Sequence, residues 1–155
     1  MKKVDIYTDG ACTGNPGKGG FGAVLIYNGV KKEISQGFLK TTNNRMELMA
    51  AIEALKMLNE PCKVDLYSDS KYLTDAINKG WLENWMKNGW RKADKKSVLN
   101  VDLWKELVCL IQKHSVSFIW VKGHAGNTYN ERCDALAVEA YTNPCLIDKN
   151  YEIDT

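Results

Sequence analysis

Four acidic residues stand where the chain should pass from a strand into a turn or begin a helix: Asp9, Glu47, Asp69 and Asp134. Carboxylates on the ends of rigid elements can converge without loop motion loosening them, and they repel one another strongly unless something joins them. Oxygen ligands of this kind select hard divalent cations, Mg²⁺ or Mn²⁺. A lone carboxylate is most often solvated. The prediction of a metal site therefore depends on the four residues as a set.

The elements that would carry these residues follow from the pattern of the chain. β-branched and aromatic runs predict strands at 4–8, 21–27 and 31–39, and Asn28-Gly29 is a hairpin signal between the last two. Asp9 closes the first of these strands and precedes a glycine-rich turn. Apolar residues at helical spacing then predict a helix over 45–58, with Glu47 in its first turns, before Pro61 prevents continuation.

The second half alternates strands and helices. Asp69 closes a strand predicted at 64–68, and Thr128 with Glu131 matches a capping box that would open the helix carrying Asp134. The remaining predicted elements are helices at 70–79, 81–88 and 101–113 and a strand at 116–121. Three strands followed by mixed helices and strands predict an α/β fold with helices packed on a mixed sheet.

Length and composition set outer limits. The 155 residues suit one domain over 1–155, and the acidic tail from about 145 is expected to be less ordered. Five cysteines without a Cys-x-x-Cys pair argue against a disulfide framework or a zinc ribbon. No signal peptide or membrane span is expected, and the net charge of +2 does not by itself indicate nucleic acid. We expect a soluble, cytoplasmic monomer that does not contact a membrane.

Five motifs together resemble bacterial type I ribonuclease H, in that family's order from about residue 2 to residue 150. They are Asp9-Gly10-x-Cys12-x-Gly14-Asn15-Pro16-Gly17, Thr41-Thr42-Asn43-Asn44-Arg45-Met46-Glu47-Leu48, Ser68-Asp69-Ser70, Trp120-Val121-Lys122-Gly123-His124 and Asn130-Glu131-Arg132-Cys133-Asp134. The resemblance implies the ribonuclease H-like α/β fold, a five-stranded mixed sheet with helices on both faces. It implies an endonuclease that hydrolyses the RNA strand of RNA–DNA hybrids with two Mg²⁺ ions, leaving 5′-phosphate and 3′-hydroxyl ends.

The resemblance also assigns roles to residues. The family's metal ligands fall on Asp9, Glu47, Asp69 and Asp134, of which Asp9 is expected to bridge the two cations. Its loop histidine, a catalytic residue that would position or relay protons, falls on His124. Its minor-groove contacts fall on Cys12, Asn15, Asn43 and Asn44, and its DNA-phosphate pocket on Thr42 and Asn100. Lys71 stands where relatives commonly have glutamine, and there it could bind a phosphate.

A basic segment lies between Lys79 and Lys96. It carries six lysines and arginines against Glu83 and Asp94, with tryptophans interleaved. Such a segment suits sequence-independent binding of phosphates and sugars. Its expected substrate-binding residues are Trp81, Trp85 and Lys87. The alternative is a solvated loop whose tryptophans belong to the core.

Two other functions stay open at this point. A nuclease of related fold could act on DNA junctions or integration substrates, although the Thr41–Leu48 motif and the basic segment argue against it. A non-catalytic hybrid-binding module would be expected to lose a carboxylate, and all four are present. Zinc binding by His124 and Cys133 is a poor alternative, because two ligands do not make a structural zinc site.

Overall fold

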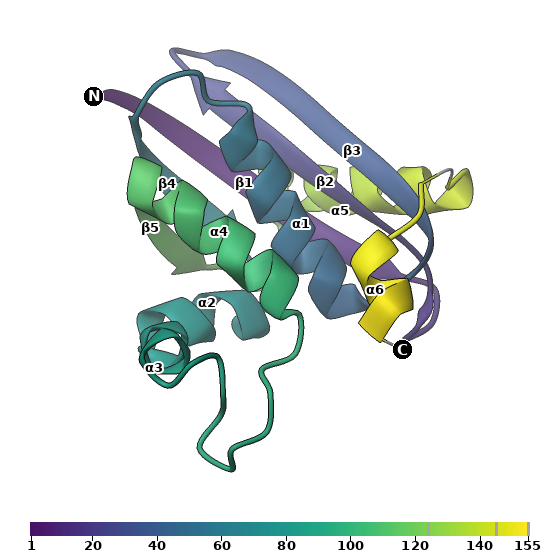
Figure 1. Ribbon diagram of the computed structural model, residues 1–155. Helices are drawn as coiled ribbons and strands as arrows, with labels where there is room; N and C mark the ends of the chain where they lie inside the picture. The colour runs from purple at the N-terminus through teal and green to yellow at the C-terminus, as the bar shows by residue number, and fades with distance from the viewer. Residues whose placement is uncertain (124, 145, 155) are drawn as a thin grey trace.

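The computed structural model of the protein describes residues 1–123, 125–144 and 146–154. Five strands form one mixed sheet in the order β3-β2-β1-β4-β5 (Figure 1). The strands are β1 (Lys2–Cys12), β2 (Gly17–Tyr27), β3 (Val30–Thr41), β4 (Cys62–Ser68) and β5 (Ser115–Trp120). The predicted five-stranded mixed sheet is confirmed, although each of the first three strands is longer than its apolar pattern indicated.

Strand direction brings two of the acidic residues to one edge of the sheet. β1, β2 and β3 form an antiparallel meander, and Asn28 and Gly29 occupy the tight turn with positive φ. β4 runs parallel to β1, and Thr8 pairs with Ser68 as the last pair of that ladder. Asp9 and Asp69 follow this pair directly, so both emerge at the same end of neighbouring strands.

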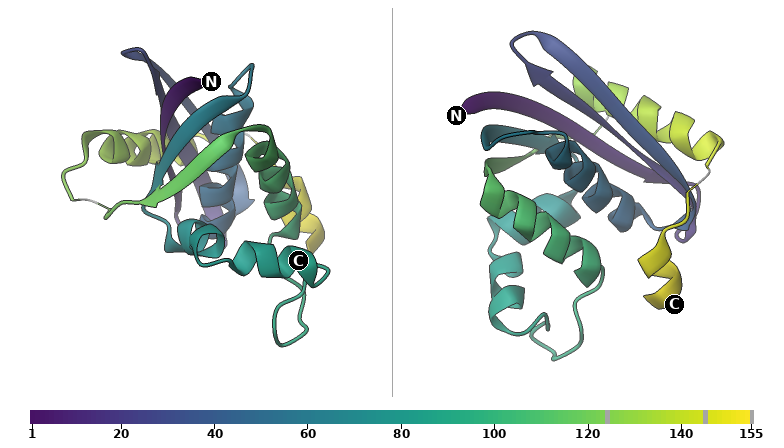
Figure 2. Two further views of the ribbon diagram at one scale, coloured as in Figure 1. Left: turned by 90° about the vertical axis from the view of Figure 1, so that its left-hand side faces the viewer. Right: turned by 45° about the horizontal axis from the view of Figure 1, so that its top comes forward.

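Helices cover both faces of the sheet, as expected. α1 and α4 lie on one face and α5 lies on the other, while α2 and α3 sit beside the end of the sheet (Figure 2). The helices are α1 (Asn43–Lys56), α2 (Lys71–Asn78), α3 (Trp81–Lys87), α4 (Val101–Lys113), α5 (Thr128–Thr142) and α6 (Lys149–Asp154).

The start of α5 differs from its prediction in one detail. The helix begins at Thr128 as expected, but the capping side chain belongs to Asn127, which accepts from the backbone N–H of Asn130 at 3.0 Å. Asparagine is as good a cap as threonine, so the residue one position earlier takes that role.

The main core lies between the sheet and the two helices α1 and α4. Ile6 and Leu66 of neighbouring strands share one cluster with Leu48 of α1 and Leu107 of α4, and all four side chains are fully buried. Trp104 is fully buried in the same cluster. Burial of this apolar area is the main force that fixes α1 on the sheet.

On the opposite face, two glycines of β2 let α5 approach closely. A Cβ at Gly20 would lie 2.5 Å from the carbonyl oxygen of Ala137, and a Cβ at Gly22 would lie 2.5 Å from that of Cys133. Both distances are too short for a real side chain, so larger residues would push α5 away from the sheet. Gly22 pairs with Asp9 across the β1–β2 ladder, so this close approach occurs beside a candidate metal ligand.

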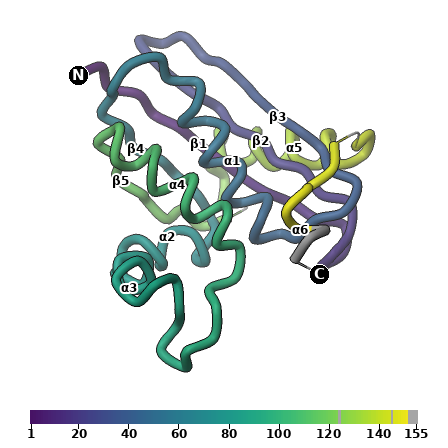
Figure 3. Tube along the Cα trace, in the orientation of Figure 1, coloured from purple at the N-terminus to yellow at the C-terminus, as the bar shows by residue number. Residues whose placement is uncertain are grey.

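The described part of the tail packs on the body, in contrast to the less ordered tail predicted from about residue 145. Leu39 donates to the carbonyl of Leu146 at 2.9 Å, and Asp148 accepts hydrogen bonds from Thr41 and Arg45. Figure 3 shows the tail lying beside the end of β3 and the start of α1. The sequence did not predict this docking, because α6 has no apolar periodicity and its anchor is a buried ion pair.

Within the part of the chain that the structure describes, none of the helices is both long and apolar enough to cross a membrane.

Candidate active site

Three of the four predicted carboxylates come together at the end of β1 and β4. Asp9, Glu47 and Asp69 each offer an oxygen, and these oxygens lie within 4.8 Å of one another. Asp9 and Glu47 are buried, and Asp69 is half-buried. Three carboxylates at this separation can share a cation, because without one their charges oppose one another.

Asp134 reaches the same place from the opposite face of the sheet. It lines the same cleft as Asp9 and lies outside the group of three converging oxygens. Its position follows from the close approach of α5 at Gly22, since Asp134 is adjacent to Cys133. The charge of Asp134 is one of the groups that raise the pKa of Asp9. The fourth carboxylate is thus placed beside the first one.

The backbone of Gly10 holds the carboxylates of Asp9 and Glu47 close together. Its backbone N–H lies 3.0 Å from Asp9 Oδ1 and 3.0 Å from Glu47 Oε1, so one donor serves both carboxylates. A Cβ on Gly10 would lie 2.6 Å from the backbone nitrogen of Glu47. The start of α1 can therefore rest directly on β1 only because this residue has no side chain.

The electrostatics of the cluster favour a bound cation. Burial, and then the charges of Glu47 and Asp69, raise the pKa of Asp9 far above its usual range. Burial and the charge of Asp69 likewise raise the pKa of Glu47. Glu47 Oε2 is buried and has no hydrogen-bond partner among the described residues. Both features fit a divalent cation at this place. The cation would give the Glu47 oxygen a partner, and its positive charge would stabilise the ionised carboxylates.

The carboxylates open into a polar cleft of about 340 Å³. Its rim consists of the first turns of α1 and α2. The lining residues are Asp9, Gly10, Asn43, Asn44, Glu47, Asp69, Ser70, Lys71, Tyr72 and Asp134. Tyr72 and Ser70 were not predicted from the sequence. Tyr72 could have been predicted from its position: it lies three residues after Asp69, in the first turn of the helix that follows this carboxylate.

The predicted minor-groove contacts lie on one side of this cleft. Asn43 and Asn44 are exposed on the first turn of α1, and both line the cleft. Asn15 is exposed on the glycine-rich turn, and its Oδ1 accepts from the backbone N–H of Asn43 at 3.1 Å. Cys12 donates its thiol to the carbonyl of Thr41 at 3.4 Å. The turn after β1 is therefore tied to the start of α1.

The predicted phosphate pair, Thr42 and Asn100, also has structural partners. Thr42 caps α1 by accepting from the backbone N–H of Arg45 at 3.3 Å. Asn100 precedes α4 with a left-handed φ of 58°, and its Nδ2 donates to the hydroxyl of Tyr72 at 3.0 Å. Both side chains thus have fixed orientations before any substrate binds.

Lys71 lies at the outer rim of the cleft. Its ammonium group is exposed and lies 5.0 Å from the ring centroid of Trp120. The indole Nε1 of Trp120 donates to the backbone carbonyl of Asp69 at 3.1 Å. Trp120 therefore links a metal-ligand candidate to a cation at the rim, and sequence reasoning did not single out this role.

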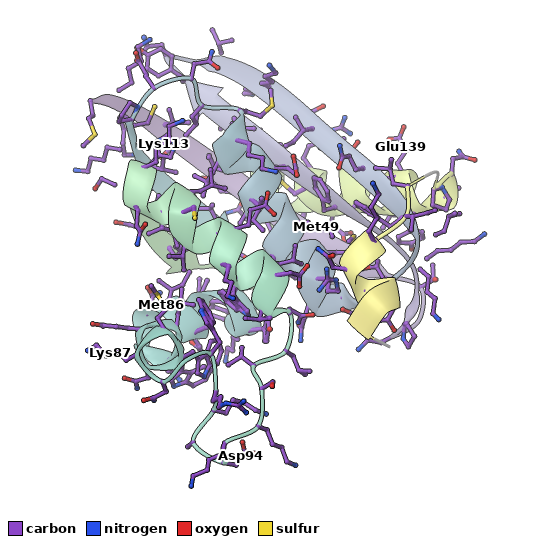
Figure 4. All side chains as sticks on the ribbon, viewed as in Figure 1. Met49, Met86, Lys87, Asp94, Lys113 and Glu139 are labelled. Carbon is purple, nitrogen blue, oxygen red and sulfur yellow. The ribbon has the colours of Figure 1, made fainter. Side chains whose placement is uncertain are left out.

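The basic segment extends away from the body as α3 and the loop before α4. Figure 4 shows Asp94 at the far end of this loop and Lys87 on the outer side of α3. Trp81 is 43% exposed. Trp85 is half-buried and packs edge-on against Trp104, 5.6 Å between ring centroids, so it also supports the segment. Lys87 is exposed and pairs with a glutamate of its own helix.

His124, the predicted proton-handling residue, lies outside the described residues. Gly123, just before it, packs against the metal-ligand candidate Asp69: a Cβ there would lie 2.6 Å from Asp69 Oδ2. The loop that carries the histidine therefore begins in contact with the carboxylate cluster.

Comparison with known proteins supports one family. The RNase H family model matches residues 1–142. A protein named Ribonuclease H from Chlorobium phaeobacteroides strain BS1 is 62% identical over 143 residues, covering 92% of this chain and 98% of its own length. One of the same name from Pseudoalteromonas atlantica is 58% identical over 147 residues, covering 95% of each chain. Among solved structures, LC9-RNase H1, described as a type 1 RNase H with the type 2 active-site motif, superposes with a TM-score of 0.82 at 33% identity, covering 92% of this chain and 73% of that chain.

Proposed function

We propose that this chain, which belongs to the RNase H family, hydrolyses the RNA strand of RNA–DNA hybrids and leaves 5′-phosphate and 3′-hydroxyl ends. The observation that carries the proposal is the convergence of Asp9, Glu47 and Asp69 beside a cleft lined by Asn43 and Asn44. Carboxylates that can hold cations and amides that can recognise a ribose occur there side by side. The retention of all four carboxylates argues against a non-catalytic hybrid-binding module.

The carboxylates would hold two divalent cations, with Mg²⁺ as the proposed ion and Mn²⁺ as a substitute. Asp9 would contribute to both positions, with Glu47 and Asp69 completing one and Asp134 the other. When bound, such a pair supplies an activated water and neutralises charge at the phosphate and at the leaving oxygen. The protein's own contribution is rigidity, because Gly10 fixes the Asp9 and Glu47 side chains by hydrogen bonds.

His124 is assigned the proton transfer that accompanies cleavage. A histidine titrates near neutral pH, so it can accept or donate a proton under working conditions. We propose that His124 positions or relays protons near the scissile phosphate and assists product release. Its replacement by alanine should slow turnover less than loss of a carboxylate, since water can partly substitute.

Choice of the RNA strand is assigned to the amides near the carboxylates. Asn15, Asn43 and Asn44 would bond to 2′-hydroxyls in the wide minor groove of the hybrid, with Cys12 beside them. A strand without 2′-hydroxyls leaves these groups unpaired, which costs binding energy. Thr42 and Asn100 would contact phosphates of the DNA strand, and the basic segment with Trp81, Trp85 and Lys87 would extend that contact.

A cleavage assay with matched duplexes tests the proposal. Labelled RNA–DNA hybrid, duplex DNA, duplex RNA and DNA duplexes with short ribonucleotide runs are incubated with Mg²⁺, with Mn²⁺ and with EDTA. We expect cleavage of the RNA strand of the hybrid only, dependence on the cation, and a need for several consecutive ribonucleotides. Efficient cutting of duplex DNA would favour the DNA-acting alternative, and hybrid binding without cleavage would favour the binding module.

Two further points remain predictions: that the protein acts as a monomer, and that it works in the cytoplasm. Sedimentation of the protein alone and bound to a short hybrid tests the first, with one chain per hybrid as the expected result.

A further inference from the structure

Arg45 is a buried cation held between two carboxylates from distant parts of the chain. Its side chain is 1% exposed. Nε and Nη2 donate to the two oxygens of Asp148 at 2.6 and 3.0 Å. Nη1 and Nη2 donate to the two oxygens of Asp102 at 2.9 and 2.7 Å. Burying a guanidinium is costly unless its donors are paired with good geometry, and two bidentate contacts meet that condition.

Asp148 is the more deeply buried of the two partners. Its side chain is 2% exposed, whereas that of Asp102 is 21% exposed. Asp148 Oδ2 also accepts from the hydroxyl of Thr41 at 2.7 Å. One carboxylate of the tail therefore ties the end of β3 to the first turn of α1. That end of α1 carries Glu47 and the exposed asparagines of the cleft.

The contacts continue from Arg45 toward the proposed substrate surface. Arg45 Nη1 also donates to Asn100 Oδ1 at 3.3 Å. The other end of the Asn100 amide donates to the hydroxyl of Tyr72 at 3.0 Å, and that hydroxyl also accepts from Trp104 Nε1 at 3.0 Å. The Asn100 amide is thus held at both ends, and Tyr72 lines the cleft.

From these contacts we infer that Asp148 is a positioning residue for hybrid binding, which acts through Arg45 on Asn100. The inference rests on the proposed function, in which Asn100 contacts the DNA strand. Asp148 fixes the guanidinium from one side, and the guanidinium fixes the oxygen of the Asn100 amide. Asp148 lies beyond residues 1–142, the segment that the family model matches. The tail therefore adds a support for the binding surface that the matched segment does not contain.

Steady-state kinetics of the full chain test this inference. Asp148→Ala removes the support, and Asp148→Asn keeps the shape with a weaker, uncharged acceptor. We expect the KM for an RNA–DNA hybrid to rise about three- to tenfold in Asp148→Ala, the size of one weakened hydrogen bond, and less in Asp148→Asn. kcat should stay within about twofold, since the carboxylate cluster keeps its Gly10 contacts. If Asp148→Ala does not fold, Asp148→Asn carries the test.

A destabilised control separates positioning from general loss of stability. Val4→Ala removes buried volume at the far end of β1, remote from Asn100, and should lower the melting temperature while leaving KM unchanged. The two variants are compared at a matched loss of stability. If KM rises as much in Val4→Ala as in Asp148→Ala, Asp148 has only a structural role.

A double-mutant cycle tests the route through Asn100. Asn100→Ala should itself raise KM, and adding Asp148→Ala to it should raise KM little further, because residues acting through one contact are not additive. Full additivity would overturn the inference. Cleavage with an unchanged KM in both Asp148 variants overturns the inference alone. Absence of hybrid cleavage by the wild type overturns the proposed function as well.

Discussion

Gly10 and Glu47 are in direct contact where β1 meets α1. They share a hydrogen bond, and their backbones lie too close together for a side chain on Gly10. The backbone N–H of Gly10 donates to Glu47 Oε1 at 3.0 Å, and a Cβ on Gly10 would lie 2.6 Å from the backbone nitrogen of Glu47. The position of the Glu47 carboxylate therefore depends on the absence of a side chain at Gly10, the residue that follows Asp9. This contact explains why a glycine follows Asp9 directly.

Gly10→Ala should displace α1 and Glu47 together. Overpacking of this kind costs about 1–3 kcal/mol. A shift of about 1 Å at a catalytic group can cost about 10²-fold in rate. We therefore expect a lower melting temperature and a kcat reduced by about that factor. Gly29→Ala is the control: with φ at 76° in the distant β2–β3 turn it also costs stability, but it should leave kcat unchanged. Equal kcat in both variants would contradict the proposed role of Gly10.

Asp9→Asn should abolish cleavage without unfolding the protein. The change removes one ligand charge and also relieves repulsion with Glu47 and Asp69. In the cation-free state, burial and then this repulsion raise the pKa of Asp9. Thermal unfolding in EDTA at neutral pH should show an equal or higher melting temperature for the variant. In Mg²⁺ the wild type should gain more stability than the variant.

Asp5→Asn is the matched control on the same strand, since Asp5 pairs with Lys3 at the surface away from the cleft. It should keep wild-type activity. Cleavage by Asp9→Asn within tenfold of wild type would rule out the bridging role of Asp9.

The basic segment should contribute affinity more than rate. Replacing Lys87, Arg91, Lys92, Lys95 and Lys96 with alanine should raise KM and leave kcat nearly unchanged. The dependence of log KM on log salt should flatten by about one unit for each phosphate that the variant no longer binds. Lys31→Ala with Lys32→Ala on β3 is the control, because both are exposed and neither lines the cleft. An unchanged salt slope would identify the segment as a solvated loop.

His114 should make folding stability depend on pH. Burial and then the charge of Lys113 lower the pKa of His114 from its ordinary 6.5, and its Nδ1 accepts from the backbone N–H of Cys62 at 3.0 Å. The neutral form is thus favoured in the folded state. Stability should be fully present above about pH 6.5 and decline as the pH falls through the lowered folded value. Urea unfolding at pH 7.5 and 5.0 measures this loss, which His114→Gln should reduce. An equal loss in that variant would assign it to other groups.

The sequence was sufficient for the parts of the fold that depend on local pattern. The Asn28-Gly29 turn, the apolar face of α1 and the polar residues that open α5 each predicted their elements, because period and turn chemistry are local properties. The motifs also named the three acids that the structure brings together. Relative strand directions then suffice to place Asp9 beside Asp69.

What the sequence could not supply were contacts between distant segments. The pairing of Arg45 with Asp148 joins residues 103 positions apart. The local sequence around neither residue predicts this contact. The same holds for Trp120, whose ring nitrogen bonds to the carbonyl of Asp69. Such contacts form only in the packed fold. For this reason the sequence did not predict that the tail, through Asp148, would bind to β3 and α1.

Lys71 gives the last prediction, because the resemblance implies a glutamine at this position. Its ammonium lies over the face of Trp120 at the rim of the cleft. A cation at this point can contact a backbone phosphate, whereas glutamine can only donate a neutral hydrogen bond. Lys71→Gln should therefore raise KM at moderate salt and reduce the salt slope by about one unit. Lys71→Arg keeps the charge and should keep the slope. A slope that stays the same in Lys71→Gln would show that the ammonium remains on Trp120 when the hybrid is bound.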